Sequence, residues 1–199
     1  THPTEYGTLY TLKELEDLSA VCHKHHMLLY LDGARLGYGL AANNSDVTLA
    51  DIARLCDAFY IGGTKCGTMY GEAVVFPEPK RADRFFSHIK RHGALLAKGW
   101  IVGMQFDTLF RKATDQSQYA DDIKETLYYS ICRHGIEQAM RIRQALVDKG
   151  YHLYLDSPTN QQFVTVTQQK ADQLAQHLTY GQWEPPHNGH VTIRFATSW

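Results

Sequence analysis

The sequence predicts an α/β protein, because short apolar runs of strand length alternate with segments of helical periodicity. Two such runs, Met27–Leu31 and Ala58–Ile61, each follow an amphipathic segment and lead into glycine. A right-handed crossover between them places the two strands parallel in one sheet. The 199 residues, 44% of them apolar and 21% charged, are enough for a well-buried core.

The helices around these two strands have clear start signals. Residues Leu12–His23 carry apolar side chains at spacings of three and four, and Thr11 precedes them as an N-cap ahead of Glu14. The glycines and asparagines of Gly37–Asn44 predict a loop, and Thr48–Cys56 predicts the next helix. The order of elements is therefore helix, strand, helix, strand.

The middle of the chain predicts a third strand and then helices. Ala73–Phe76 has the length of a short strand and is closed by prolines, while Arg81–His92 and Ala94–Phe110 are helical in pattern. The polar stretch Lys112–Gln118 breaks this periodicity. We place a domain boundary there, with residues 1–115 in a larger domain and 116–199 in a smaller one.

The C-terminal part predicts a small α/β domain. A long helix is expected over Ala120–Lys149, with Gly150 as its C-cap. The remaining predicted elements are strands at Tyr151–Leu155, Gln162–Thr167 and Val191–Ala196 and a helix at Ala171–Leu178. No internal repeat interrupts this order.

Charge and cysteine content narrow the functional classes. Lys and Arg number 20 against 21 Asp and Glu, so no overall positive field attracts nucleic acid or anionic lipid, and we expect neither as a partner. The apolar runs are too short to span a membrane. The four cysteines form no C-x-x-C pair, which is typical of a reducing, cytoplasmic compartment. We find no set of metal ligands.

Three charged side chains follow the two predicted parallel strands. Asp32 and Arg35 come directly after the first strand, and Lys65 comes after the second. Because the carboxyl ends of parallel strands form the ligand crevice, we expect the three to converge. Taken alone, Asp-Gly is an ordinary turn and a lysine after Gly-Gly an ordinary solvated end. Together, they predict a partly desolvated lysine that attacks a carbonyl carbon.

The sequence resembles the threonine aldolase and β-eliminating lyase family of pyridoxal-phosphate enzymes. The motifs that carry the resemblance are Thr4–Tyr10 (TEYGTLY), Leu31–Leu36 (LDGARL), Gly62–Gly67 (GGTKCG), Lys98–Gly99 ahead of Gln105–Phe106, and Arg194–Trp199 (RFATSW). They are in order along most of the chain. The resemblance implies fold type I, the aspartate aminotransferase-like fold, with part of the large-domain sheet and a small C-terminal α/β domain.

The resemblance also implies roles for individual residues. Lys65 carries pyridoxal 5'-phosphate as a Schiff base, Asp32 pairs with the pyridine nitrogen, and Thr64 and Arg35 also contact the cofactor. Arg35 and Arg194 hold the substrate α-carboxylate, since a guanidinium binds a carboxylate with two hydrogen bonds. The implied reaction cleaves a β-hydroxy amino acid, such as threonine or phenylserine, to glycine and an aldehyde. A homodimer or homotetramer is expected, because sites of this family lie at subunit boundaries.

The chain departs from the family pattern at its beginning. Family members are longer and start with a segment that holds the cofactor phosphate and a ring over the pyridine, and neither precedes Leu12 here. We therefore expect the C-terminal part of such a carbon–carbon lyase, incomplete and weak in cofactor binding on its own. Two alternatives remain: a β-eliminating lyase or aminotransferase on the same fold, and a non-catalytic truncated chain.

Overall fold

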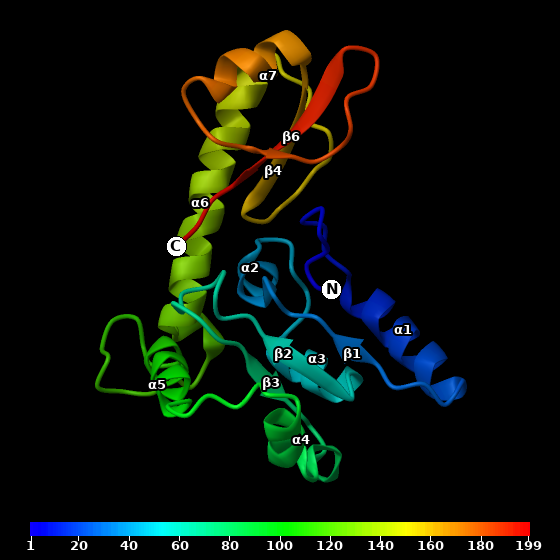
Figure 1. Ribbon diagram of the computed structural model, residues 1–199, viewed down its shortest axis with the longest axis vertical. Helices are drawn as coiled ribbons and strands as arrows, with labels where there is room; N and C mark the ends of the chain where they lie inside the picture. The colour runs from blue at the N-terminus through cyan, green and yellow to red at the C-terminus, as the bar shows by residue number, and fades with distance from the viewer.

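Two three-stranded sheets are joined by one long helix in the computed structural model, which describes residues 1–199 (Figure 1). The α-helices are α1 (Leu12–Lys24), α2 (Leu36–Ala41), α3 (Leu49–Leu55), α4 (Phe85–Arg91), α5 (Trp100–Leu109), α6 (Leu127–Asp148) and α7 (Gln168–Ala175). The strands are β1 (Tyr30–Leu31), β2 (Ala58–Ile61), β3 (Ala73–Val75), β4 (Gln161–Thr167), β5 (Gly181–Gln182) and β6 (His190–Ala196). Short 3-10 helices are η1 (Pro79–Ala82) and η2 (Ile123–Glu125). None of the helices is both long and apolar enough to cross a membrane.

The first sheet has the order β1-β2-β3. Strands β1 and β2 run parallel, with Tyr30 opposite Ala58 and Leu31 opposite Phe59, which confirms the predicted crossover. Strand β3 pairs with β2 in the antiparallel direction. The predicted strand over 27–31 is longer than the observed β1, because residues 27–29 form no ladder with β2. The Met27 amide bonds the end of α1, Leu28 is exposed, and Leu29 bonds Asp57 ahead of β2.

The helices that flank this sheet begin at the residues that the sequence marks. Thr11 caps α1 and exchanges hydrogen bonds with Glu14, and Thr48 and Asp51 form the same capping box at α3. Each box satisfies backbone N–H groups that the first turn of a helix leaves without partners. Both predicted helices are confirmed within two residues of their bounds.

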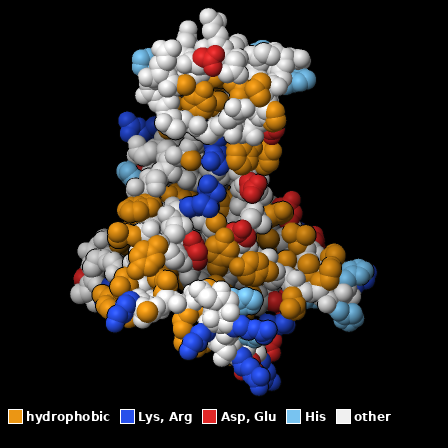
Figure 2. Space-filling model, in the orientation of Figure 1, with side chains coloured by type: hydrophobic (Ala, Val, Ile, Leu, Met, Phe, Trp, Pro, Cys, Tyr) orange, Lys and Arg blue, Asp and Glu red, His pale blue; other side chains and the backbone are white.

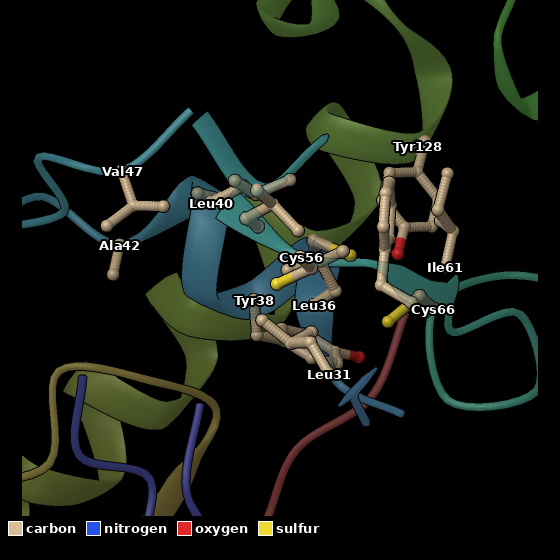
Figure 3. Packing of buried hydrophobic residues seen from close by; sticks show 14 of the residues in the cluster. Leu31, Leu36, Tyr38, Leu40, Ala42, Val47, Cys56, Ile61, Cys66 and Tyr128 are labelled. Carbon is tan, nitrogen blue, oxygen red and sulfur yellow. The ribbon is translucent and has the colours of Figure 1, made fainter. Parts of the chain in front are cut away.

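The predicted loop over Gly37–Asn44 is wrong in its first half, where the short helix α2 forms. All six residues of α2 are buried, and they pack against α6 in the core shown in Figure 3. A Cβ atom on Gly37 would lie 2.9 Å from the ring of Tyr128 on α6. Gly37 therefore permits close packing of α2 on α6, while Gly39 faces His2 and Pro3, and neither glycine marks a turn.

The second sheet has the order β4-β6-β5 and is antiparallel throughout. It packs against α7 and the C-terminal half of α6, and buried valines and isoleucine fill a small core between them (Figure 1). Gly150 follows α6 with a φ of 77°, as expected for a C-cap. The N-terminal half of α6 contributes Tyr128, Cys132 and Ile136 to the core of the first sheet. The division at residues 115 and 116 stays a prediction.

Other elements differ from the prediction in length. The helix expected over 94–110 begins only at Trp100, and that over 81–92 splits into η1 and α4 around Arg84, whose φ is 57°. The helix expected over 171–178 lies three residues earlier, capped by Thr167. Residues 151–155 alternate in burial as a strand would, but they form a single bridge between Leu153 and Val164. Strand β5 was not predicted, since two residues carry no periodicity.

Candidate functional site

The ends of β1 and β2 meet in two glycine-containing loops. The Gly62 amide donates a hydrogen bond to the Gly33 carbonyl oxygen at 2.9 Å, which joins the two loops directly. A Cβ atom on Gly62 would collide with the carbonyl oxygens of Gly33 and Ala34. Glycine is therefore required where these two backbones touch. The contact brings Asp32 and Lys65 to the same edge of the sheet.

A small pocket of about 80 Å³ lies at this edge. Its walls are formed by Thr1, Pro3, Thr4, Glu5, Asp32, Ala34, Arg35 and Lys65. The structure thus brings three of the five predicted site residues together. Thr64 does not line the pocket; it is exposed, and its hydroxyl donates to Glu72 at 2.7 Å. Arg194 is also outside the pocket wall and reaches the site from the second sheet.

One oxygen of Asp32 is occupied and the other is free. The Tyr60 hydroxyl and the Ala34 amide, the latter at 3.0 Å, both donate to Oδ1. No group of the protein donates to Oδ2. Partial burial by itself raises the pKa of Asp32, but the two hydrogen bonds and the positive charges of the Thr1 amino group and Lys65 together lower it below its usual value. The carboxylate is therefore kept ionised, with one oxygen available to a ligand.

Two buried tyrosines hold the backbone of the Lys65 loop from below. Tyr38 donates to the Lys65 carbonyl oxygen at 2.8 Å, and Tyr128 donates to that of Gly62 at 3.0 Å. Tyr38, Tyr128 and Cys66 all belong to the core that Figure 3 shows in close view. The backbone on either side of the lysine is thus anchored to the core. The Lys65 side chain itself is exposed, so the partial desolvation expected of it is not present in this structure.

Glu72 holds the same loop from the opposite side. Its carboxylate accepts hydrogen bonds from the Gly63 amide and from the Thr64 hydroxyl, one on each oxygen. Sequence reasoning did not single out Glu72, because it lies in a loop seven residues beyond Lys65 and no periodicity links the two. Glu72, Tyr38 and Tyr128 therefore fix the backbone around Lys65, and none of them contacts the Lys65 side chain by a hydrogen bond.

Arg35 and Arg194 approach each other from different sheets. Burial lowers the pKa of Arg35, and the positive charge of Arg194 lowers it further. No carboxylate lies within ion-pair distance of Lys65, Arg35 or Arg194. Half-buried guanidinium groups that lack a protein anion are suited to bind an anionic ligand.

Two further residues, not predicted from the sequence, orient Arg194. Its guanidinium lies over the ring of Trp183, 4.9 Å from the ring centroid, and its Nη1 donates to Gln161 at 3.2 Å. A cation over an aromatic face is stabilised by the ring electrons. Antiparallel pairing of β4 with β6 would have placed a β4 residue beside Arg194, but Trp183 comes from a loop that the sequence pattern does not locate.

His2 is a buried histidine next to the site. Its backbone amide donates to the Asp32 carbonyl oxygen at 3.1 Å, while neither of its ring nitrogens has a hydrogen-bond partner. Burial, together with the positive amino group of Thr1, lowers the pKa of His2 to about 4. The ring is therefore neutral at pH 7. The sequence shows a histidine before proline and no sign of its burial.

Comparisons with known proteins show which family and which structures this chain resembles. The family model for β-eliminating lyase matches residues 1–180. A low specificity L-threonine aldolase from Pseudomonas sp. is 36% identical over 174 residues, which are 77% of this chain and 49% of that protein. The structure of a Leishmania major threonine aldolase superposes with a TM-score of 0.89 at 38% identity, over 100% of this chain and 54% of that one.

A more distant structure confirms the predicted fold class. A pyridoxal-phosphate-bound protein from Clostridium difficile 630, described as an aminotransferase, superposes with a TM-score of 0.60 at 11% identity, over 98% of this chain and 52% of that one. At this identity the likeness concerns the fold alone, which is that of fold type I. The chain spans about half the length of these relatives.

Proposed function

The chain belongs to the β-eliminating lyase family, and we propose that it acts as a pyridoxal-phosphate-dependent aldolase that cleaves β-hydroxy amino acids to glycine and an aldehyde. The names of two relatives support the aldolase reaction over others of the family, since both are threonine aldolases. The substrate class we propose comprises threonine and phenylserine.

The observation that carries the proposal is a set of cations that have no anionic partner in the protein and lie near an ionised carboxylate. Lys65, Arg35 and Arg194 have no ion-pair partner, and Asp32 offers one free oxygen. An aldehyde cofactor with a basic ring nitrogen and an amino acid with a carboxylate together satisfy all four groups. The residues present therefore fit pyridoxal phosphate.

Each residue has a distinct task in this proposal. The Lys65 amine binds the cofactor carbon, and Asp32 Oδ2 holds the proton on the ring nitrogen. Thr64 contributes a hydroxyl beside the lysine. Arg35 and Arg194 bind the substrate α-carboxylate by hydrogen bonds and so orient the Cα–Cβ bond that is cleaved. When bound, the cofactor supplies an electron sink for the bond that breaks.

A second candidate function is β-elimination or amino transfer at the same site. The family model is named for elimination, and the lysine and aspartate tasks are common to these reactions. Assays with threonine and phenylserine on one side, and tyrosine and tryptophan on the other, separate the two. Glycine plus aldehyde identifies the aldolase, and ammonia plus a 2-oxo acid identifies the lyase. A 2-oxo acid formed without ammonia, and only when a second 2-oxo acid is added as amino acceptor, identifies amino transfer.

The proposal is tested by borohydride trapping of the lysine-bound cofactor. We expect the purified protein, mixed with pyridoxal phosphate and reduced, to carry the cofactor mass on the peptide that contains Lys65. Lys65→Ala should lose the absorbance band of the lysine-bound cofactor and should not carry the cofactor mass after reduction. Lys170→Ala, which changes an exposed lysine on α7, should keep both. Labelling that persists in Lys65→Ala would refute the assignment, and a protein that binds no cofactor would support a non-catalytic chain.

We also propose that the protein forms a homodimer or homotetramer. Large apolar side chains are exposed around α5 and the loop before Glu72, and orange patches on the α5 side of the molecule are visible in Figure 2. They include Met69, of which 85% is exposed, and Trp100 and Met104. Contiguous exposed apolar groups mark association surfaces. Sedimentation of Trp100→Glu should then show a smaller species than the unchanged protein. The cytoplasmic setting stays a prediction.

A further inference from the structure

Strand register places Tyr60 beside Asp32. Tyr30 pairs with Ala58 and Leu31 with Phe59, so the next step along both strands brings Asp32 opposite Tyr60. Phe59 and Ile61 point into the core, and alternation directs the Tyr60 side chain to the other face of the sheet. The tyrosine hydroxyl reaches Asp32 across the pair of strands.

The hydrogen bonds of Asp32 determine which of its oxygens remains available. Tyr60 and the Ala34 amide both donate to Oδ1. Two donors, one from the turn after β1 and one from strand β2, restrict rotation of the carboxylate about its Cβ–Cγ bond, because a quarter turn would break both bonds and a half turn only exchanges the two equivalent oxygens. One donor alone, the Ala34 amide, belongs to the same turn as Asp32 and moves with it. The hydroxyl from β2 is therefore the contact that ties the carboxylate to the rest of the sheet.

We propose that Tyr60 is a positioning residue, which fixes the Asp32 carboxylate so that Oδ2 is presented to the ring nitrogen of the cofactor. The last step of this inference rests on the proposed function, since it names the pyridine nitrogen as the group that Oδ2 meets. The first step, the hold of Tyr60 on Asp32, concerns the protein alone and is measurable without cofactor.

The substitution Tyr60→Phe removes only the hydroxyl. Tyr30→Phe is the matched control, because Tyr30 lies on β1 with its ring centroid 6.3 Å from that of Tyr60 and makes no hydrogen bond to Asp32. Thermal melting of both variants checks that each is folded. The same chemical change is thus made at two neighbouring rings, one of which touches the carboxylate.

The first measurement uses the protein without cofactor. Carboxyl carbon NMR follows the titration of Asp32, whose signal is identified by its loss in Asp32→Asn. Loss of the Tyr60 donor should raise the pKa of Asp32, because burial then opposes ionisation with less compensation, whereas Tyr30→Phe should leave the titration unchanged. Both variants retain the charged groups that act on Asp32, which are the Thr1 amino group and Lys65. An unchanged titration in Tyr60→Phe would overturn the inference.

The second measurement uses the cofactor-loaded protein. Tyr60→Phe should weaken pyridoxal-phosphate binding about tenfold, the effect of one hydrogen bond to a charged group, and shift the pH dependence of the bound cofactor's absorbance. In an Asp32→Asn background the same substitution should change affinity little. Equal affinity and spectra in Tyr60→Phe and Tyr30→Phe would overturn the positioning role while the proposed function stands. If borohydride traps no cofactor on Lys65 of the unchanged protein even at saturating pyridoxal phosphate, the proposed function is rejected for this chain, and the last step with it, while the titration still tests the hydrogen bond from Tyr60 to Asp32.

Discussion

The two sheets supply charged groups to the site by different means. Asp32 and Lys65 lie beyond the ends of β1 and β2, in loops whose shape depends on glycines and on hydrogen bonds from single side chains. Arg194 lies within β6 and is paired on both sides, with Phe163 of β4 and Gly181 of β5. A strand residue takes its direction from the register of the whole ladder.

The difference shows where each part of the site is vulnerable. In the first sheet, one lost hydroxyl or carboxylate releases one catalytic group and leaves the strands intact. In the second sheet, the backbone of Arg194 is held by many ladder bonds, and only the tip of its side chain depends on particular neighbours. Substitutions in the two regions should therefore separate turnover from substrate affinity.

The largest effect is expected at the end of β1. Asp32→Ala removes the anion that faces the ring nitrogen and should lower kcat about a thousandfold, equivalent to about 4 kcal/mol of barrier, while the fold is retained. Steady-state kinetics with threonine measures the loss, and circular dichroism checks the fold. Asp172→Ala on the exposed face of α7 is the control. Near-full turnover in Asp32→Ala would remove this residue from the mechanism.

In the second sheet, the change with the largest expected effect is Arg194→Lys. Lysine keeps the charge but loses the planar fork and the stack on Trp183, so KM for the amino acid should rise about 10- to 100-fold with a smaller change in kcat. Arg141→Lys on α6, where Arg141 bonds only Gln138, should leave KM unchanged. A fall in kcat alone would place Arg194 in a step after substrate binding and contradict the comparison.

The sequence predicted the strands and helices of the first sheet better than the side-chain contacts between them. Apolar runs, caps and glycine-bounded strand ends located the parallel pair and the convergence of Asp32, Arg35 and Lys65, because these depend on local pattern and on the handedness of the crossover. The glycines of α2 misled the same reasoning. Gly37 permits a close contact with α6, which lies some ninety residues away in sequence, and Gly39 lies against His2 and Pro3.

The residues that hold the catalytic groups could be predicted only in part. Tyr60 follows from the register once the two strands are known to be parallel, and that inference was available from the sequence. Glu72 and Trp183 act from loops, whose course no periodicity describes. The same holds for the two tyrosines below Lys65, since their hydrogen bonds depend on how α2 and α6 pack.

A smaller effect is expected from His2, which belongs to the first region. Because burial lowers its pKa to about 4, the unfolded chain binds a proton between pH 6.5 and about 4 that the folded chain does not. Stability should therefore fall as pH decreases through this window, by at most about 1.4 kcal/mol per pH unit. His2→Phe should flatten the dependence of Tm on pH, and His190→Phe, at an exposed end of β6, should not. An equal slope in His2→Phe and the unchanged protein would contradict the buried neutral ring.

The smallest effect is expected at Glu72. It tests whether a single side chain supports the Lys65 loop, in contrast to the ladder hydrogen bonds that support β6. Glu72→Gln removes the negative charge: the amide oxygen can still accept from the Gly63 amide while the N–H₂ group donates to the Thr64 hydroxyl, so both contacts become weaker hydrogen bonds between neutral groups. We expect a loss of about 1 kcal/mol in the free energy of unfolding and a few-fold fall in kcat, because the Lys65 backbone remains anchored by Tyr38. Denaturant unfolding and steady-state kinetics measure the two. Glu78→Gln, at an exposed partner of Arg81, is the control. If Glu72→Gln changed KM and left kcat intact, the loop would bind substrate directly, and its role as a support for Lys65 would have to be abandoned.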